Sequence, residues 1–130
     1  MYQFSINSKA KLRTCDERLQ KLFNEVVEHI DCTIIEGRRT DQDQQKAYNE
    51  GKSHLKPGQS KHNNKVSLAV DVAPYPIDWE DLNRFYYFSG IVRGIAFARN
   101  IPIRWGGDWD NDNDLKDQKL MDLVHFEINE

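Results

Sequence analysis

The sequence has few cysteines, no long apolar run and little excess charge, and each shortage excludes a class of protein. Its two cysteines, Cys15 and Cys32, are too few for a secreted scaffold held together by disulfides. They also lack the Cys-x-x-Cys spacing of a thiolate zinc site. We therefore expect two buried thiols in a reducing compartment.

Hydropathy and charge argue against membrane insertion and nucleic-acid binding. Mean hydropathy is -0.78, and no apolar run approaches the roughly 18–20 residues that span a bilayer. Residues 1–5 lack a basic segment followed by an apolar one, so no signal peptide is expected. A net charge of -3 offers no positive surface for a phosphate backbone.

The composition is that of an ordinary globular protein. Hydrophobic residues make up 38% and charged residues 30% of the 130 positions, which is typical of a folded chain with a core. This length corresponds to one domain, residues 1–130. We expect that domain to be a monomer.

Periodicity along the chain predicts both helices and short strands. Apolar residues at helical spacing, or a polar stretch ending at glycine, predict helices at 16–29, 41–50 and 78–100. Short apolar or β-branched runs predict strands at 33–35, 68–72, 101–105 and 123–128. A long polar loop at 52–66 and an acidic loop at 106–119 connect them. Without a strand–helix–strand rhythm, the pattern predicts an α+β fold.

Histidines and aspartates near the predicted strands are candidate metal ligands and catalytic groups. His62 ends a polar loop, Asp71 ends an apolar run, and Asp122 precedes His125 in the last strand. Two imidazoles and a carboxylate would hold zinc with a position open for water. A second carboxylate can then take a proton, and Arg39 can stabilise an oxyanion. By spacing alone the signal is weak, and a salt-bridged Asp71 with ordinary histidines remains the alternative.

Other residues admit two interpretations each. Trp105 and Trp109 line a substrate cleft or pack in the core. Glu127, two residues past His125, competes with Asp122 as the base. The acidic stretch 108–114 lacks the glycine and glutamate that an EF-hand loop needs. A solvated loop is therefore favoured there over a looser divalent-cation site.

Four segments, in this order, resemble the motifs of one family of zinc peptidases. They are Gly37-Arg38-Arg39-Thr40 with Gln44, Ser60-x-His62 with Ala69-Val70-Asp71, Arg104-Trp105-Gly106-Gly107-Asp108-Trp109, and Asp122-x-x-His125-Phe126-Glu127. The family is that of the zinc D-alanyl-D-alanine carboxypeptidases and L-alanyl-D-glutamate endopeptidases. It includes the VanY-like peptidases, and the chain is most similar to the small bacteriophage endolysins.

The resemblance implies a fold, a cofactor and roles for named residues. The fold is the small antiparallel sheet flanked by helices of the D-Ala-D-Ala carboxypeptidase and hedgehog-like zinc peptidases. Zn²⁺ is held by His62, Asp71 and His125, and Asp122 is the general base. Arg39 contacts the oxyanion or substrate, and it is preferred over the alternative Arg38 because it precedes Thr40 as in the motif. The substrate-binding residues implied are Ser60, Gln44, Trp105 and Trp109.

The implied activity is hydrolysis of the L-Ala-D-Glu amide in the stem peptide of peptidoglycan. An endolysin without a signal peptide stays in the host cytoplasm until it is released to the wall. A D-Ala-D-Ala carboxypeptidase or dipeptidase, and a non-catalytic wall-binding module, are the alternatives.

One departure concerns the spacing of the first two ligands. Eight residues separate His62 from Asp71, where the family usually has six, and the usual glycine after the histidine is missing. Two extra residues preserve the side-chain parity of a strand, so we expect both ligands to be retained.

Overall fold

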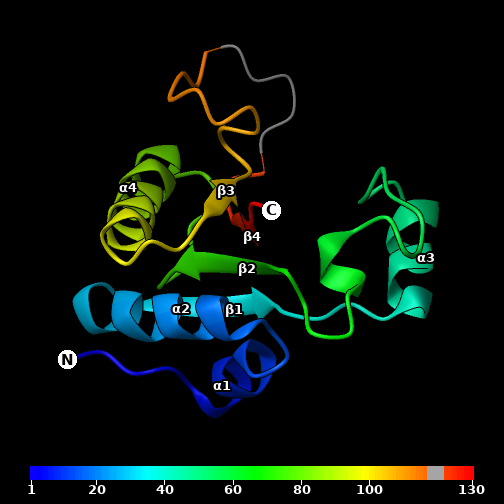
Figure 1. Cartoon of the computed structure of the whole chain (residues 1–130), viewed down its shortest axis with the longest axis horizontal. Helices are drawn as coiled ribbons and strands as arrows, with labels where there is room; N and C mark the ends of the chain where they lie inside the picture. Colours follow the sequence, from blue (N-terminus) through cyan, green and yellow to red (C-terminus); the bar gives the residue numbers. More distant parts are fainter. Residues whose placement is uncertain (117–121) are drawn as a thin grey trace.

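The computed structural model describes residues 1–116 and 122–130, and within them a four-stranded sheet is flanked by helices (Figure 1). The strands are β1 (Cys32–Glu36), β2 (Ala69–Pro74), β3 (Ile103–Trp105) and β4 (His125–Ile128). They follow the order β1-β2-β4-β3, and every neighbouring pair is antiparallel. The predicted α+β class with an antiparallel sheet is therefore confirmed.

The helices are α1 (Ile6–Leu12), α2 (Glu17–His29), α3 (Asp41–Asn49) and α4 (Leu82–Ala98), with a short 3-10 turn η1 (Lys61–Asn63). The three predicted helices and four predicted strands are all present. The helix expected at 78–100 begins four residues later, where the Asp81 side chain accepts a hydrogen bond from the backbone of Arg84. No helix of the described residues is long and apolar enough to cross a membrane.

Helix α1 was not predicted, because it has no apolar stripe. Its buried residues are Ser8 and Leu12. The Ser8 hydroxyl accepts a hydrogen bond from the Ile34 backbone N–H at 3.0 Å and lies 3.1 Å from the Thr33 hydroxyl. A polar side chain thus docks this helix on β1, which hydrophobic periodicity cannot reveal.

The core lies between one face of the sheet and helices α2 and α4. Leu19, Leu22, Phe23 and Val26 of α2 are fully buried, and so are Phe88 and Val92 of α4, Val70 and Val72 of β2, and Phe126 and Ile128 of β4. The rings of Phe23 and Phe126 meet edge to face at 5.4 Å. Cys15 and Cys32 are free thiols buried in this core.

Strand parity places a second set of side chains on the opposite face of the sheet. When Val70, Val72, Phe126 and Ile128 face the helices, Asp71, His125 and Glu127 face away from them. Asp71 pairs with His125, and Ala69 pairs with Glu127. The polar candidates therefore gather on this second face, on the two central strands.

Candidate metal centre and active site

His62, Asp71 and His125 converge on one point although they lie on three different elements. His62 Nε2 and His125 Nδ1 each lie 3.3 Å from Asp71 Oδ1. One ligand atom from each of the three residues lies within 4.8 Å of the other two. All three residues are buried, with His62 2% and Asp71 9% exposed. The structure thus brings together the three metal ligands expected from the sequence.

The turn η1 and the loop before α3 orient His62. The Ser60 hydroxyl accepts the His62 backbone N–H, and the Asn63 side chain accepts the Ser60 backbone N–H, forming a capping box. His62 Nδ1 lies 2.7 Å from the carbonyl oxygen of Gly37. Because a carbonyl only accepts, Nδ1 carries the proton and the lone pair is on Nε2, which faces Asp71.

The longer spacing between His62 and Asp71 still leaves the two side chains in contact. Ser67 pairs with the segment between α1 and α2, donating its backbone N–H to Thr14 and accepting that of Asp16. Leu68 returns to η1 by donating to the Lys61 carbonyl. The loop thus absorbs the extra residues, and Asp71 keeps the face that strand parity predicts.

The electrostatics of the cluster reflect burial and mutual contact. Burial by itself would raise the pKa of Asp71, but the His125 and His62 rings outweigh burial and hold that pKa well below its usual range. Burial would lower the pKa of His125, but Asp71 and Glu127 raise it to about 9. The site therefore favours a negative carboxylate facing positive charge.

The donor set fits a zinc ion. His62 Nε2 and Asp71 Oδ1 are buried and make no hydrogen bond to the described residues. Buried polar atoms left in this state are costly. Two imidazole nitrogens and one carboxylate oxygen form a common zinc ligand set, with the fourth position left for water or substrate.

Asp122 lies beside this cluster, at the start of the segment leading into β4. Its backbone N–H donates to Gly106 O, and the Gly106 N–H donates to His125 O, each at 2.8 Å. Burial, together with the negative charge of Asp71, raises the pKa of Asp122, while His125, His62 and Arg39 oppose the rise. A half-buried carboxylate with a raised pKa is suited to proton transfer.

Arg39, rather than Arg38, is directed toward the site. Its guanidinium donates to Glu36 at 2.8 and 2.6 Å and to Gln44 Oε1 at 2.8 Å. The hydrogen bonds to Glu36 raise the pKa of Arg39, so it stays charged. The Arg38 side chain is exposed and its Nε donates to the Asn64 carbonyl.

The comparisons with known proteins decide the family. A sequence model described as phage L-alanyl-D-glutamate peptidase matches residues 1–129. The chain belongs to this family. It is 33% identical over 123 residues to the L-alanyl-D-glutamate peptidase of Escherichia phage T5, covering 90% of this chain and 88% of that protein.

A solved structure supports the fold of this phage peptidase. The Serratia marcescens L-Ala D-Glu endopeptidase ChiX superposes with a TM-score of 0.78 at 23% identity. The match covers 98% of this chain and 91% of that one. The resemblance inferred from the four motifs is thereby confirmed.

Ser60 and Gln44, two of the residues expected to bind substrate, make hydrogen bonds within the protein. Ser60 caps η1, as described above. Gln44 is fully buried, accepts from Arg39, and donates to Ser53 Oγ and Leu55 O at 3.0 and 2.6 Å. Gln44 therefore ties Arg39 to the loop after α3.

The two tryptophans have different environments. Trp105 is 2% exposed, belongs to the core and donates its indole N–H to Leu123 O at 2.9 Å. This burial corrects the expectation that Trp105 lines the cleft and selects its alternative, core packing. Trp109 is half-buried, and its ring lies 5.1 Å from that of His125.

Two features of the active-site region were not predicted from the sequence, although Glu127 itself was considered there as a rival base. Glu127 holds His125 Nε2 at 2.8 Å. A cavity of about 220 Å³ also opens beside Asp122, lined by Trp79, Leu82, Phe85, Leu123 and Val124. Trp79 is 59% exposed and stacks on Phe85 with ring centroids 5.6 Å apart. No motif marks these aromatic residues, and only the tertiary structure brings them to Asp122.

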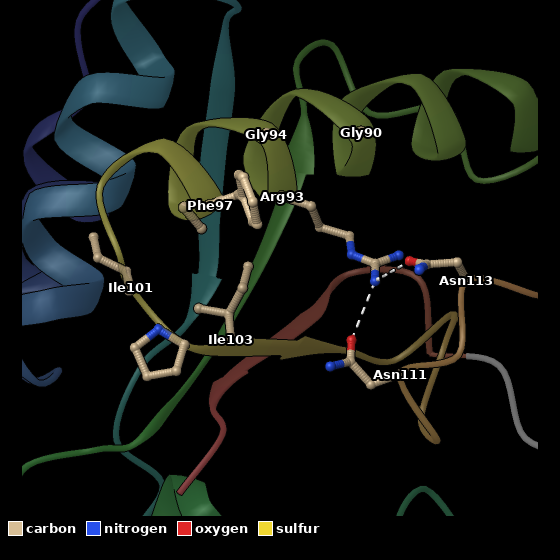
Figure 2. A pocket seen from close by; sticks show the side chains of 10 residues that line it. Gly90, Arg93, Gly94, Phe97, Ile101, Ile103, Asn111 and Asn113 are labelled. Carbon is tan, nitrogen blue, oxygen red and sulfur yellow. Dashed lines mark hydrogen bonds between the residues drawn. The ribbon is translucent and has the colours of Figure 1, made fainter.

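A second cavity, of about 540 Å³, lies between α4 and the segment around β3 (Figure 2). Figure 2 shows Arg93 reaching from α4 to the side chains of Asn111 and Asn113, at 3.2 and 3.3 Å. None of the candidate metal or catalytic residues lines this cavity.

In the described part of the acidic loop, hydrogen bonds converge on Asp108. Asp108 is fully buried and accepts the backbone N–H groups of Asp112 and Asn113, at 3.3 and 2.9 Å. Arg93 pairs with it at 3.2 Å. Asp110 and Asp112 have carboxylate oxygens near that of Asp108 but are exposed. The remainder of the predicted loop, residues 117–119, lies outside the described residues.

Proposed function

We propose that this chain is a zinc-dependent phage endolysin that hydrolyses the L-Ala-D-Glu amide bond in the stem peptide of peptidoglycan. It would be made in the host cytoplasm and act after release to the wall. The observation that carries the proposal is the convergence of His62, Asp71 and His125 within 4.8 Å, in a chain of the phage L-alanyl-D-glutamate peptidase family.

The three proposed ligands suit a zinc ion that takes part in hydrolysis. His62 Nε2, Asp71 Oδ1 and His125 Nδ1 would hold zinc, which when bound lowers the pKa of water and polarises the scissile carbonyl. The Gly37 carbonyl keeps His62 in the tautomer that leaves Nε2 free.

Asp122 is proposed as the general base and Arg39 as the electrostatic contact. Asp122 accepts a proton from the attacking water and delivers it to the leaving amine, and its raised pKa favours this exchange. Arg39 has five N–H donors, of which Glu36 and Gln44 occupy three. The other two can contact the oxyanion or a substrate carboxylate.

The cavity beside Asp122 is proposed to receive the uncharged side of the substrate. Trp79, Leu82 and Phe85 line it, and Asp122 is the one charged residue among the described residues of its lining. The L-Ala methyl and the lactoyl group that precedes it carry no charge, whereas the D-Glu side carries carboxylates. Apolar walls therefore favour the L-Ala side.

The test is incubation of the protein with Gram-negative sacculi, with and without a zinc chelator, followed by mass spectrometry of the soluble products. The proposal expects chelator-sensitive release of peptides with a new D-glutamate N-terminus. Free D-alanine would establish a carboxypeptidase instead. Zinc binding without cleavage would favour a wall-binding module.

A matched pair of histidine variants ties the activity to the site. His62→Ala removes a proposed ligand and is expected to abolish both zinc binding and product release. His54→Ala changes an exposed histidine of the same loop and is expected to leave both unchanged. Equal activity in the two variants would refute the assignment of His62.

A further inference from the structure

We propose that Glu127 is a positioning residue that holds His125 with Nε2 protonated, so that Nδ1 is presented to the metal. This inference rests on the zinc site of the proposed function. It is carried by the position of the Glu127 carboxylate, which contacts His125 on the side away from Asp71.

The strand geometry places Glu127 where it can act on His125. Both residues are on β4 and, being two apart, point to the same face of the sheet. The Glu127 side chain is 7% exposed. Across the sheet it is opposite Ala69 on β2 and Arg104 on β3. The small Ala69 leaves room on that face, and Arg104 supplies a cation.

Each oxygen of Glu127 already has a partner. Oε1 lies 2.8 Å from His125 Nε2. Oε2 accepts from Arg104 Nη2 at 2.8 Å and lies 3.1 Å from Lys61 Nζ. With two cations beside it the carboxylate stays ionised and only accepts hydrogen bonds. Nε2 of His125 must therefore be the donor, which leaves Nδ1 to face Asp71 at 3.3 Å.

These contacts also distinguish Glu127 from Asp122. Glu127 was the rival base, but its two oxygens contact His125, Arg104 and Lys61 and it is nearly inaccessible to water. A base needs an oxygen that can reach the attacking water. The geometry therefore gives Glu127 a role that acts through His125 and not on the substrate.

Lys61 connects this contact to the other histidine ligand. It is adjacent to His62 in η1, and its ammonium contacts both Glu127 and the carbonyl oxygen of Ile128. The turn that carries His62 is thus fastened to the strand that carries His125. Outer partners of this kind orient metal ligands and strengthen their bonds, and removing one typically weakens metal binding about 10–100-fold.

The experiment measures the zinc Kd of the purified protein by competition with a chelating dye. Glu127→Ala removes the acceptor and is expected to raise the Kd about 10–100-fold. Glu127→Gln keeps an acceptor oxygen but loses the charge, so a smaller rise is expected. Glu25→Gln is the matched control, because it neutralises a glutamate paired with Arg99 on the surface, and its Kd should equal that of the wild type.

A second measurement does not depend on how the variants fold. NMR of the imidazole nitrogens in the zinc-loaded wild type should show His125 bound through Nδ1, with a protonated Nε2. Binding through Nε2 would overturn the proposal, and so would a folded Glu127→Ala protein whose zinc Kd stays within twofold of the wild type.

The same measurements separate this inference from the proposed function. A wild type that binds zinc with the expected His125 tautomer but cleaves no sacculi would refute the peptidase assignment and leave the role of Glu127 intact. Cleavage with an unchanged Kd in Glu127→Ala would refute only the role of Glu127.

Discussion

Replacing Gly106 by alanine tests how closely the Asp122 backbone must be held. A Cβ at Gly106 would lie 2.0 Å from the carbonyl oxygen of Asp122 and 2.9 Å from its carbonyl carbon. Contacts under 3.0 Å are essentially never seen for a Cβ, so the two backbones must separate by about 1 Å. The obstacle is backbone, which cannot rotate away as a flexible side chain would.

The separation has a cost that can be worked out from the contacts. It strains or breaks two hydrogen bonds, from Asp122 N–H to Gly106 O and from Gly106 N–H to His125 O, each contributing about 1 kcal/mol. Overpacking adds about 1–3 kcal/mol. The free energy of unfolding should fall by about 3–5 kcal/mol, which a typical domain can survive.

The effect on hydrolysis should exceed the effect on zinc binding. A shift of about 1 Å in a catalytic group costs on the order of 10²-fold in rate, and Asp122 is the group displaced. One proposed ligand, His125, is hydrogen-bonded to Gly106 through its backbone carbonyl only, whereas His62 and Asp71 stand on η1 and β2. The zinc Kd should therefore change less than the rate of peptide release from sacculi.

The assay compares initial rates of D-glutamate-terminated peptide release with unfolding by denaturant. Gly94→Ala is the control, because Gly94 lies within α4 and an added Cβ meets nothing within 4 Å. That substitution should leave activity unchanged and stabilise the helix by about 0.5–1 kcal/mol. A Gly106→Ala protein with wild-type rate and stability would refute the reasoning.

Three further predictions concern the base, the aromatic cavity and the thiols. Asp122→Asn should slow hydrolysis about 10²–10⁴-fold while the zinc Kd, measured by dye competition, stays close to wild type; a normal rate would exclude Asp122 as the base. Trp79→Ala should raise the KM for sacculus fragments without changing zinc affinity, whereas Tyr87→Ala, which removes another exposed aromatic residue, should not; equal effects would argue against the cavity. Burial raises the pKa of Cys15 to about 11 and of Cys32 to about 12, so neither folded thiol should react quickly with a thiol reagent at pH 8, and both should react after unfolding in denaturant. Rapid labelling of the native protein would contradict this burial.

Local sequence patterns were enough to predict a helix or strand wherever neighbouring residues share one environment. The apolar stripe of α2 follows the period of a helix because one side of it packs on the core. The run that forms β2 is apolar apart from Asp71, because that strand is buried on both faces. Pro74, which has no N–H to donate, is the last residue of this strand.

The position of a side chain relative to other helices and strands could not be predicted from local patterns. The local sequence does not distinguish Trp105 from Trp109. In the structure, Trp105 ends β3 inside the core, whereas the Trp109 ring lies beside that of His125. Gln44 reads as one polar residue of a polar helix. It is buried because its side chain forms hydrogen bonds with Arg39 and with the Leu55 carbonyl, both of which lie outside that helix.

For this phage peptidase, local sequence patterns were enough to predict the α+β class, the positions of most elements and the residue types able to bind zinc. Side-chain parity also placed Asp71 on one face of its strand, and His125 with Glu127 on one face of another. That these faces coincide depends on long-range packing, which pairs β2 with β4 in a register that sets Asp71 opposite His125. Pairings between segments so far apart in the chain leave no periodic trace in either segment. The residues alone therefore indicated the chemistry, and their assembly into a site was expected only from the family resemblance.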